Sequence, residues 1–437
     1  MSELPIVVIG GGAAGIIAAW RAASLGGRVI VLERNKKLGI KLLISGGGKC
    51  NITHAGAMEE VRTTFVAGEA RFLKPSFFQF TNDDIARMIE AKGVKTYVRP
   101  NGRIFPLNGS ADDVVDALAS YLDDANVDVR LNARVISLKQ SNGQIEGVKL
   151  DKEEIRSHHV VIATGGASYP KTGTTGDGVA WAKDVGHTII PLRPALAPIG
   201  VEPRLPADWR GIALRNGSLM VFADGKKVAE WRDDIMFSHE GVTGPAALEV
   251  SRAAAGLLDQ HDVELRFDFF PAKEFLALDA ELNALVLSQR DKMIATLLNA
   301  WLPNRLVEPL LTVAGVDAAT RGHTFTRNHR RSVVQVLKDW KLGNVATVNL
   351  ERGEVTAGGV TLGEVDPRTM RSRKVKGLYL CGEVLDVAGR VGGYNLQAAF
   401  STGFVAGETA ARDCQQEIGI FDHATLLNKT HSDSSPA

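Results

Sequence analysis

The residues whose spacing points most directly to chemistry are a glycine triplet and an acid: Gly10, Gly12, Gly15 and Glu33. The triplet follows the apolar run Ile6–Ile9 as Gly-x-Gly-x-x-Gly, and the acid closes a second apolar run, Val29–Leu32. In such a unit the glycines permit a tight turn, approach of a pyrophosphate and close helix–sheet packing, and the acid binds a ribose. A glycine-rich turn without a ligand is the alternative, but the flanking apolar runs favour a dinucleotide site.

A second glycine cluster indicates which dinucleotide is bound. The first helix should bind a pyrophosphate through its free amides, which include those of Ala13 and Ala14. The second cluster comprises Lys41, Ser45, Gly46, Gly47, Gly48 and Asn51. It can fold back over the pyrophosphate and reach a flavin ring, which a plain nicotinamide dehydrogenase does not require. We therefore predict FAD. Glu33 disfavours a 2′-phosphorylated ribose, although Arg34 beside it keeps that alternative open.

Two later strand ends are expected to complete the cofactor site. The apolar run His159–Ile162 leads to small residues, where a side chain would collide with a ligand: Thr164, Gly165 and Gly166. A strand over Gly377–Cys381 ends in a glycine loop and a helix, which supply Gly382, Glu383, Asp386, Gly392, Gly393, Tyr394, Asn395, Leu396 and Gln397. The amide of Val135 is expected near the adenine. Thr172–Gly178 either borders the flavin or only caps the helix that follows it.

The candidate catalytic residues are Tyr394 and His239, because a flavin transfers hydride while the protein supplies orientation and a proton. Tyr394 could act as an acid or pack on the ring, and His239 could shuttle a proton or cap a helix. Other candidates for a substrate wall are Ser238, Arg327, His329, Arg330 and Arg331. For the arginine cluster, a solvated basic face is the favoured interpretation and a carboxylate site the alternative.

Composition restricts the remaining classes of function. The 437 residues carry a net charge of +1, which gives no indication of nucleic acid or an anionic membrane as a partner. The apolar runs are short, and the first strand begins within a few residues of Met1, so neither a membrane span nor a signal peptide is expected. Cys50, Cys381 and Cys414 form no CxxC pair, which is typical of a reducing cytoplasm. Cys50 is expected to pack rather than react, and no histidine spacing indicates a metal site.

The elements that must position these residues form an α/β domain that is interrupted by an insertion. The FAD-binding parts are residues 1–190 and 353–412, and residues 413–437 form a tail that is expected to be disordered from Asp422. Residues 191–352 are β-rich, with alternation over Leu214–Phe222 and Val263–Phe269 and a helical subdomain at about 272–328. Short strands are expected over 332–350.

Four motifs together resemble the BaiN/YhiN-like NAD(P)/FAD-dependent oxidoreductases, over roughly residues 4–412. They are the N-terminal fingerprint with Lys41 and Ser45–Thr53, Phe237–Pro245, Val355–Val360, and Gly382–Asp386 with Gly392–Gln397. The resemblance implies a Rossmann-like FAD domain of the glutathione-reductase/fumarate-reductase type, split by a β-barrel-like domain with a small helical subdomain. Members catalyse different reactions, so the resemblance indicates the cofactor better than the substrate.

We predict a cytoplasmic FAD-dependent oxidoreductase that transfers hydride between the flavin and a small organic substrate, bound between the two domains. There is no second Gly-x-Gly-x-x-Gly followed by a helix, so NAD(P)H is expected to dock transiently as the electron donor. One alternative is an oxygen-using amine or amino-ketone oxidase. The other is an FAD-dependent RNA-modifying or RNA-binding protein, against which the near-neutral charge argues. An FAD-binding protein without turnover is a further possibility.

Overall fold

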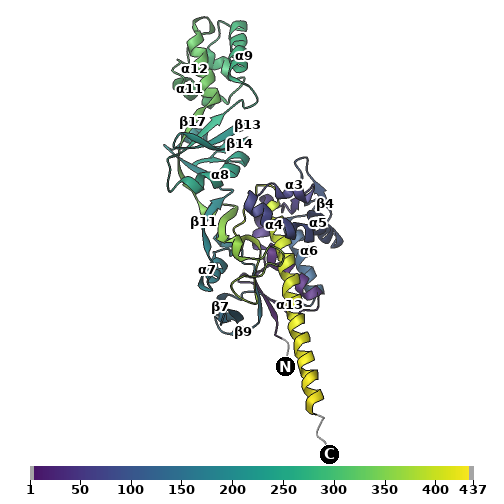
Figure 1. The fold of residues 1–437 in the computed structure, drawn as a ribbon. Helices are drawn as coiled ribbons and strands as arrows, with labels where there is room; N and C mark the ends of the chain where they lie inside the picture. The colour runs from purple at the N-terminus through teal and green to yellow at the C-terminus, as the bar shows by residue number, and fades with distance from the viewer. Residues whose placement is uncertain (1–3, 433–437) are drawn as a thin grey trace, which may run out of the picture. The chain divides into compact units, whose positions relative to one another are not determined.

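The computed structural model describes residues 4–432, with side chains described as far as Glu417 (Figure 1). The chain divides into two compact units. Unit 1 comprises Met1–Leu192 and Val355–Ala437, and unit 2 comprises Arg193–Glu354. The buried apolar residues form one cluster within unit 1 and two clusters within unit 2, so each unit has a core of its own.

Unit 1 is built on a parallel five-stranded sheet with the strand order β19, β10, β1, β2, β6. Its strands are β1 (Ile6–Ile9), β2 (Val29–Leu32), β6 (Asp128–Arg130), β10 (His159–Ile162) and β19 (Leu378–Leu380). β1, β2 and β10 are buried throughout, which explains their continuous apolar sequences. Because β2 and β10 flank β1, the strand order reverses at β1, and such a switch point is where open α/β sheets bind ligands.

Three smaller sheets accompany the main sheet. The first contains β3 (Thr53–His54), β5 (Arg103–Pro106) and β4 (Thr96–Val98), and the second β7 (Val135–Ser141), β8 (Gln144–Leu150) and β9 (Glu154–Arg156). β11 (Ile189–Ala195) pairs with β18 (Val355–Val360), so the two chain segments at the ends of the insertion lie together.

The helices of unit 1 are α1 (Ala13–Ser24), α2 (Ile40–Ile44), α3 (Met58–Arg62), α4 (Ala67–Gln79), α5 (Asn82–Ala91), α6 (Ala111–Asp124), α7 (Asp177–Asp184) and α13 (Tyr394–Ser432). α6 is capped by Ser110, whose side chain accepts from the Asp113 amide in a capping box. α13 packs closely on α1, because a Cβ at Gly403 or Gly407 would lie 2.3 or 2.1 Å from the carbonyl oxygen of Ala14 or Ala18.

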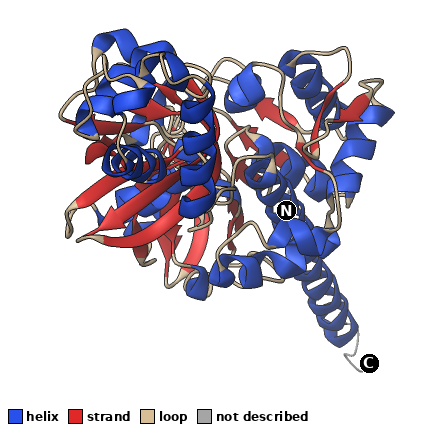
Figure 2. Ribbon diagram, turned by 90° about the horizontal axis from the view of Figure 1, so that it is seen from above, coloured by secondary structure: helices blue, strands red, loops and turns tan. Residues whose placement is uncertain are grey.

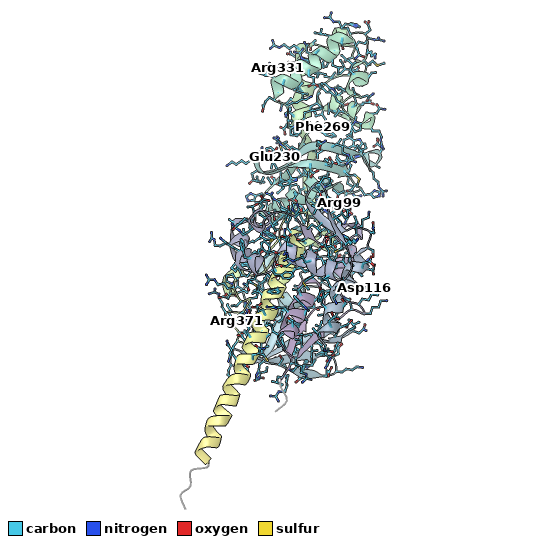
Figure 3. The ribbon with its side chains drawn as sticks, turned by 90° about the vertical axis from the view of Figure 1, so that its right-hand side faces the viewer. Arg99, Asp116, Glu230, Phe269, Arg331 and Arg371 are labelled. Carbon is cyan, nitrogen blue, oxygen red and sulfur yellow. The ribbon has the colours of Figure 1, made fainter. Side chains whose placement is uncertain are left out.

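α13 extends further than the sequence predicted. The expected end was near Arg412 with disorder from Asp422, whereas the helix runs to Ser432, and residues 433–437 lie outside the described residues. The Asp413 carboxylate accepts hydrogen bonds from Arg371 Nε and from the Tyr379 hydroxyl, both at 2.7 Å, and these bonds hold the helix beyond Arg412 (Figure 3). Even α13 does not combine the length and apolar character needed to cross a bilayer, nor does any other helix in the described chain.

Unit 2 contains a closed six-stranded barrel with the order β12, β15, β14, β13, β16, β17, whose long strands stand out in Figure 2. The strands are β12 (Ile199–Glu202), β13 (Ala213–Ala223), β14 (Lys226–Phe237), β15 (Gly241–Thr243), β16 (Val263–Asp268) and β17 (Trp340–Val348). Aromatic side chains, including Trp209, Phe237, Phe267 and Trp340, contribute to its core. This observation confirms the predicted class, a Rossmann-like domain interrupted by a β-barrel.

The helices of unit 2 are α8 (Pro245–Leu257), α9 (Phe275–Ser288), α10 (Ile294–Leu298), α11 (Asn304–Val313) and α12 (Arg327–Lys338). The prediction of short strands over 332–350 is wrong in its first half, because α12 continues to Lys338 before β17 begins. Val333, Val334 and Leu337 are fully buried on one helix face. Valine favours strands over helices, but burial of Val333 and Val334 in the core of the helical part overrides that local preference.

Candidate cofactor site and family

Four of the predicted site segments meet at one edge of the main sheet. β1, β2, β10 and β19 run parallel, so Gly10, Glu33, Thr164 and Gly382 all follow strands at the same edge. A Cβ built on Gly10 would lie 2.5 Å from the Ala163 carbonyl oxygen, and one on Gly382 would lie 2.9 Å from Ala14 Cβ. The fold therefore brings together residues that are more than 300 positions apart in the sequence.

Each glycine of the fingerprint has a distinct steric environment. Gly10 has a φ of +104°, which other residues rarely adopt. A Cβ at Gly15 would lie 1.8 Å from the Gly10 carbonyl oxygen, so α1 can start only where this side chain is absent. At Gly12, no described atom lies within 4 Å of such a Cβ, which leaves open space beside the backbone. This open backbone at a helix start can accommodate a pyrophosphate.

Glu33 is fixed by the turn that it faces. Its two carboxylate oxygens accept hydrogen bonds from the amides of Gly11 and Asn35, both at 2.7 Å, and its exposed fraction is 7%. Each carboxylate oxygen can accept more than one hydrogen bond, so both can still receive a ribose hydroxyl. The Asn35 and Glu33 carbonyls accept from the amides of Asn132 and Ala133, and this pairing brings the chain just before Val135 alongside Glu33.

Arg34 points to a different loop. Its Nη1 donates to the Thr175 hydroxyl at 2.7 Å and to the Asp177 carboxylate at 3.0 Å. The side-chain Nδ2 of the neighbouring Asn35 donates to the Thr172 carbonyl at 3.0 Å. Residues 172–177 are thereby attached to the end of β2, and the arginine that could have bound a 2′-phosphate forms an ion pair instead.

Lys41 and Glu383 form an ion pair of 2.8 Å within the site. Lys41 Nζ also donates to the Ser168 hydroxyl at 2.8 Å, and the second Glu383 oxygen accepts from the Thr356 amide at 2.7 Å. The Thr356 hydroxyl in turn accepts from the amides of Ala167 and Ser168. Sequence reasoning missed Ser168 and Thr356, although each lies within two residues of a predicted motif.

The second glycine cluster contains space and an unpaired acceptor. A Cβ at Gly46 would lie 2.7 Å from the Asn51 amide nitrogen, whereas no described atom lies within 4 Å of one at Gly47 or Gly48. The Ser45 hydroxyl donates to the Leu42 carbonyl at 2.8 Å. The Asn51 side-chain oxygen is buried and has no hydrogen-bond partner in the described structure. Such an atom is costly unless a ligand or water pairs with it.

Cys50 follows the open glycines Gly47 and Gly48 in the sequence, but its environment does not favour a nucleophilic thiolate. The residue is fully buried, and burial raises the pKa of its thiol to about 11, against a smaller lowering by the hydrogen bond to Ser45. Thiolates, rather than thiols, are nucleophiles, so this environment suits packing. Cys381 and Cys414 are also buried and form no disulfide. In the described part of the chain, no group of three His, Cys, Asp or Glu side chains could hold a metal ion.

Gly165 and Gly166 are required by the packing of the protein itself, in addition to the reason expected from the sequence. The sequence suggested that a side chain there would collide with a ligand. In the structure, a Cβ on Gly165 would lie 2.7 Å from Thr174 Cγ2, and one on Gly166 would lie 2.4 Å from Thr356 Oγ1. The collisions are therefore with the protein itself. The Thr164 hydroxyl next to them is buried and lacks a partner among the described residues.

The glycine loop before α13 is braced by the amide side chains that were predicted to bind the cofactor. Asn395 accepts from the Gly389 amide at 2.8 Å and donates to the Gly389 carbonyl at 3.0 Å. Gln397 is fully buried, accepts from the Thr53 hydroxyl at 2.6 Å and donates to the Phe80 carbonyl at 3.2 Å. These side chains hold the loop, while Gly392 and Gly393, with φ of 146° and 93°, allow its path. Leu396 is half-buried, and Asp386 accepts from the Gly358 amide at 2.9 Å.

The two candidate catalytic residues belong to different units. Tyr394 in unit 1 is half-buried, and its ring stacks on the His54 imidazole with 4.7 Å between centroids, a contact that sequence reasoning missed. His239 in unit 2 is exposed in the turn between β14 and β15, where the Ser238 hydroxyl accepts from the Gly241 amide at 3.2 Å. Of the arginine cluster, Arg330 is paired with Asp279 at 2.8 Å and is a structural residue of the helical part.

These observations fit FAD. Glu33 offers carboxylate oxygens to a ribose, Gly12, Gly47 and Gly48 leave the backbone accessible, and Asn51 and Thr164 hold buried oxygen atoms without a described partner. The switch-point position also matches a site for a dinucleotide.

Known proteins match this chain over most of its length. The model of the HI0933-like protein Rossmann domain matches residues 4–409. The 3-dehydro-bile acid delta(4,6)-reductase of Clostridium scindens is 31% identical over 411 residues, which cover 93% of this chain and 98% of that protein. The ribosomal RNA dihydrouridine synthase of Escherichia coli is 29% identical over 418 residues, with the same coverage of both proteins.

Solved structures show the fold alone. The 3-ketosteroid delta1-dehydrogenase of Sterolibacterium denitrificans has a TM-score of 0.53 at 14% identity and covers 94% of this chain and all of that one. A variant of Escherichia coli quinol fumarate reductase FrdA has a TM-score of 0.50 at 16% identity, with 98% of this chain and 74% of that one covered. The chain therefore belongs to the HI0933-like family of BaiN/YhiN-like flavoproteins and is an FAD-dependent oxidoreductase.

Proposed function

We propose that this protein reduces a carbon–carbon double bond that is conjugated to a carbonyl group. The observation that carries the proposal is that two relatives, each matching 93% of this chain, have names that describe such reductions. A bile-acid delta(4,6)-reductase acts on an unsaturated 3-ketone, and dihydrouridine is uridine with its conjugated ring double bond reduced. The two reactions differ in substrate, but both reduce a carbon–carbon double bond that is conjugated to a carbonyl group. All the residues that we predict to bind the cofactor lie within the part of the chain that matches the family.

When bound, FAD supplies the hydride for such a reaction. Glu33 would hold the ribose, and the turn Gly10–Gly15 and the Gly46–Gly48 cluster would surround the pyrophosphate. The Lys41–Glu383 pair fixes α2 relative to the end of β19 and places a cation beside it. Protonation of the second carbon requires an acid, for which we propose Tyr394, held by stacking on His54, or His239.

The electron donor is proposed to be NAD(P)H, which would dock transiently because the chain has no second dinucleotide fingerprint. The first experiment is anaerobic reduction of the purified holoprotein by NADH and by NADPH, followed by flavin absorbance. Rapid bleaching by either nucleotide supports a reductase. Bleaching only by an amine or amino ketone, with peroxide formed on readmission of air, would instead establish the oxidase alternative.

The acceptor is identified in a second step with the reduced protein. A steroid 4-en-3-one, free uridine and a ribosomal RNA transcript would be added separately under anaerobic conditions. Return of the oxidised flavin spectrum with a saturated product supports the proposal, and failure of all conjugated acceptors contradicts it. Uridine within ribosomal RNA is a second candidate substrate, favoured by full-length relatives in Escherichia coli and Haemophilus influenzae that carry that name, both at 29% identity.

A further inference from the structure

Unit 2 carries a cluster of exposed basic side chains that the cofactor site does not use. We define the basic patch as Arg290, Lys292, Arg321, His323, Arg327 and Arg331, all of which are exposed. Segments 290–293 and 320–331, which contain the patch, include a single acid, Asp291. The whole chain carries a net charge of only +1, so these two segments hold a local excess of positive charge.

Tertiary pairing assembles the patch from two segments that are distant in the sequence. The Gly322 amide donates to the Lys292 carbonyl at 3.0 Å, and the His323 amide donates to the Arg290 carbonyl at 2.9 Å. Arg321 also donates to the Asp291 carbonyl at 2.7 Å. These bonds hold Arg290 and Lys292 beside Arg321 and His323, directly before the start of α12.

The patch continues onto α12 with Arg327 and Arg331, which are one helical turn apart and therefore lie on the same face. Figure 3 labels Arg331 on this helical part of unit 2. The first turn of α12 contains no acid, although acids are favoured there and cations are not. Arg330 differs from its neighbours because Asp279 and Asn283 accept its hydrogen bonds. The fold thus uses one arginine of this run for its own packing and leaves two at the surface.

We propose that the basic patch binds the phosphate backbone of RNA and docks a ribosomal RNA substrate on unit 2. This inference rests on the second candidate substrate of the proposed function. The positive charge of the patch complements the phosphate backbone of RNA, which arginine and lysine side chains commonly contact. In addition, two relatives that match over their full length have names that give ribosomal RNA as the substrate. Phosphate contacts orient an RNA without reading its sequence, so recognition of a particular uridine would come from the active site.

The test is salt-dependent binding of a fluorescein-labelled in vitro transcript of ribosomal RNA to the full-length holoprotein, followed by anisotropy. The variant combines Arg321→Gln, Arg327→Gln and Arg331→Gln. Each phosphate contact to single-stranded nucleic acid contributes about 0.7 to the log–log salt slope, so the slope should fall by about 2. Affinity at moderate salt should drop by about tenfold or more. An unchanged circular dichroism spectrum and unchanged thermal unfolding report that unit 2 of the variant is folded.

Two matched variants separate charge from structure. Lys149→Gln, Lys152→Gln and Lys226→Gln together remove three exposed positive charges elsewhere and should leave the slope unchanged. Arg321→Lys, Arg327→Lys and Arg331→Lys together keep the charge and should retain most of the slope. Equal slopes for the glutamine triple variant and the wild type would overturn the proposal. Tighter binding of the wild type to phosphatidylglycerol vesicles than to RNA would also overturn it, by assigning the patch to a lipid surface.

Failure of this inference and failure of the proposed function give different results. If the protein binds no RNA but its reduced flavin is reoxidised by a steroid enone, the reductase proposal stands and the docking proposal falls. If RNA binds through the patch but no conjugated double bond is reduced, the docking proposal stands and the reductase proposal falls.

Discussion

At the scale of single residues, Glu33 is the cofactor residue whose role can be tested most directly. Its two oxygens accept from the Gly11 and Asn35 amides, and a glutamine would turn an NH2 group towards one of these donors. We expect Glu33→Gln to weaken FAD binding by about 10- to 100-fold, because hydrogen bonds to a charged group contribute about 1.5–3 kcal/mol. Titration of the apoprotein with FAD, followed by flavin fluorescence, measures this. The exposed Glu351→Gln is the control, and equal affinity of Glu33→Gln and wild type would refute the role.

The cysteines give a second prediction at this scale. Burial raises the pKa of Cys50 to about 11, so about one thiol in a thousand is ionised at pH 8. Cys381 and Cys414 are buried as well. The native protein should therefore show no rapid reaction with Ellman's reagent at pH 8, and the unfolded protein should show three thiols. A fast native thiol that Cys50→Ala abolishes would show that Cys50 is accessible and activated.

At the scale of elements, the contact between α13 and α1 positions the helix start that we propose binds the pyrophosphate. Gly407→Ala would place a Cβ 2.1 Å from the Ala18 carbonyl oxygen, so the helices must separate. We expect a net loss of stability, because overpacking costs about 1–3 kcal/mol and the gain in helix propensity is at most about 1 kcal/mol. FAD affinity should fall too, since α1 begins at the fingerprint turn. Thermal unfolding with and without FAD measures both effects.

Gly419→Ala is the matched control within the same helix. No described atom lies within 4 Å of a Cβ at Gly419, so only the propensity gain should remain and stability should stay equal or rise slightly. If both alanine variants behave alike, close packing through Gly407 is not what holds α13 to α1.

Glu364 links the chain after α7 to the segment before β19 and gives a prediction on pH. Burial opposes its ionisation, but hydrogen bonds from Lys374, Thr188 and His187 outweigh this and lower its pKa from 4.5 to about 2. Because the folded pKa lies below the unfolded one, the stabilisation is complete above about pH 4.5 and is lost as the pH falls towards 2. Urea unfolding midpoints of wild type and Glu364→Gln should therefore differ most at pH 6 and converge on acidification. A constant difference from pH 6 to pH 3 would contradict the linkage.

At the scale of the whole molecule, unit 1 is formed by two chain segments whose ends pair as β11 and β18. A short linker between Leu192 and Val355 should therefore replace unit 2 without breaking the FAD domain. We expect this shortened protein to fold and bind FAD, because every cofactor residue named above belongs to unit 1, but not to turn over a conjugated substrate. Circular dichroism, FAD titration and anaerobic reoxidation measure the three properties. Loss of FAD binding in a folded protein would show that unit 2 contributes to the cofactor site.

Local sequence determined the parts of this protein whose geometry depends on neighbouring residues. The spacing of Gly10, Gly12 and Gly15 between two apolar runs specifies a strand–turn–helix unit. Gly10 adopts a positive φ and Gly15 avoids a clash within that unit, whereas Gly12 leaves its backbone open. Ser110 likewise identified a helix start, because a capping box is completed within four residues. The change from continuous apolar strands to alternating ones marked the insertion, since a barrel strand buries one face only.

Tertiary structure alone decided which distant side chains meet. Lys41 and Glu383 were both recognised from their motifs, but their ion pair depends on how β19 aligns with the first strands. The side chain of Gln397, predicted from its motif as a cofactor residue, pairs with the Thr53 hydroxyl and the Phe80 carbonyl, because the fold buries these groups together. The basic patch was invisible to composition for the same reason: the net charge of a chain sums over all residues, whereas a binding surface depends on which of them folding places side by side.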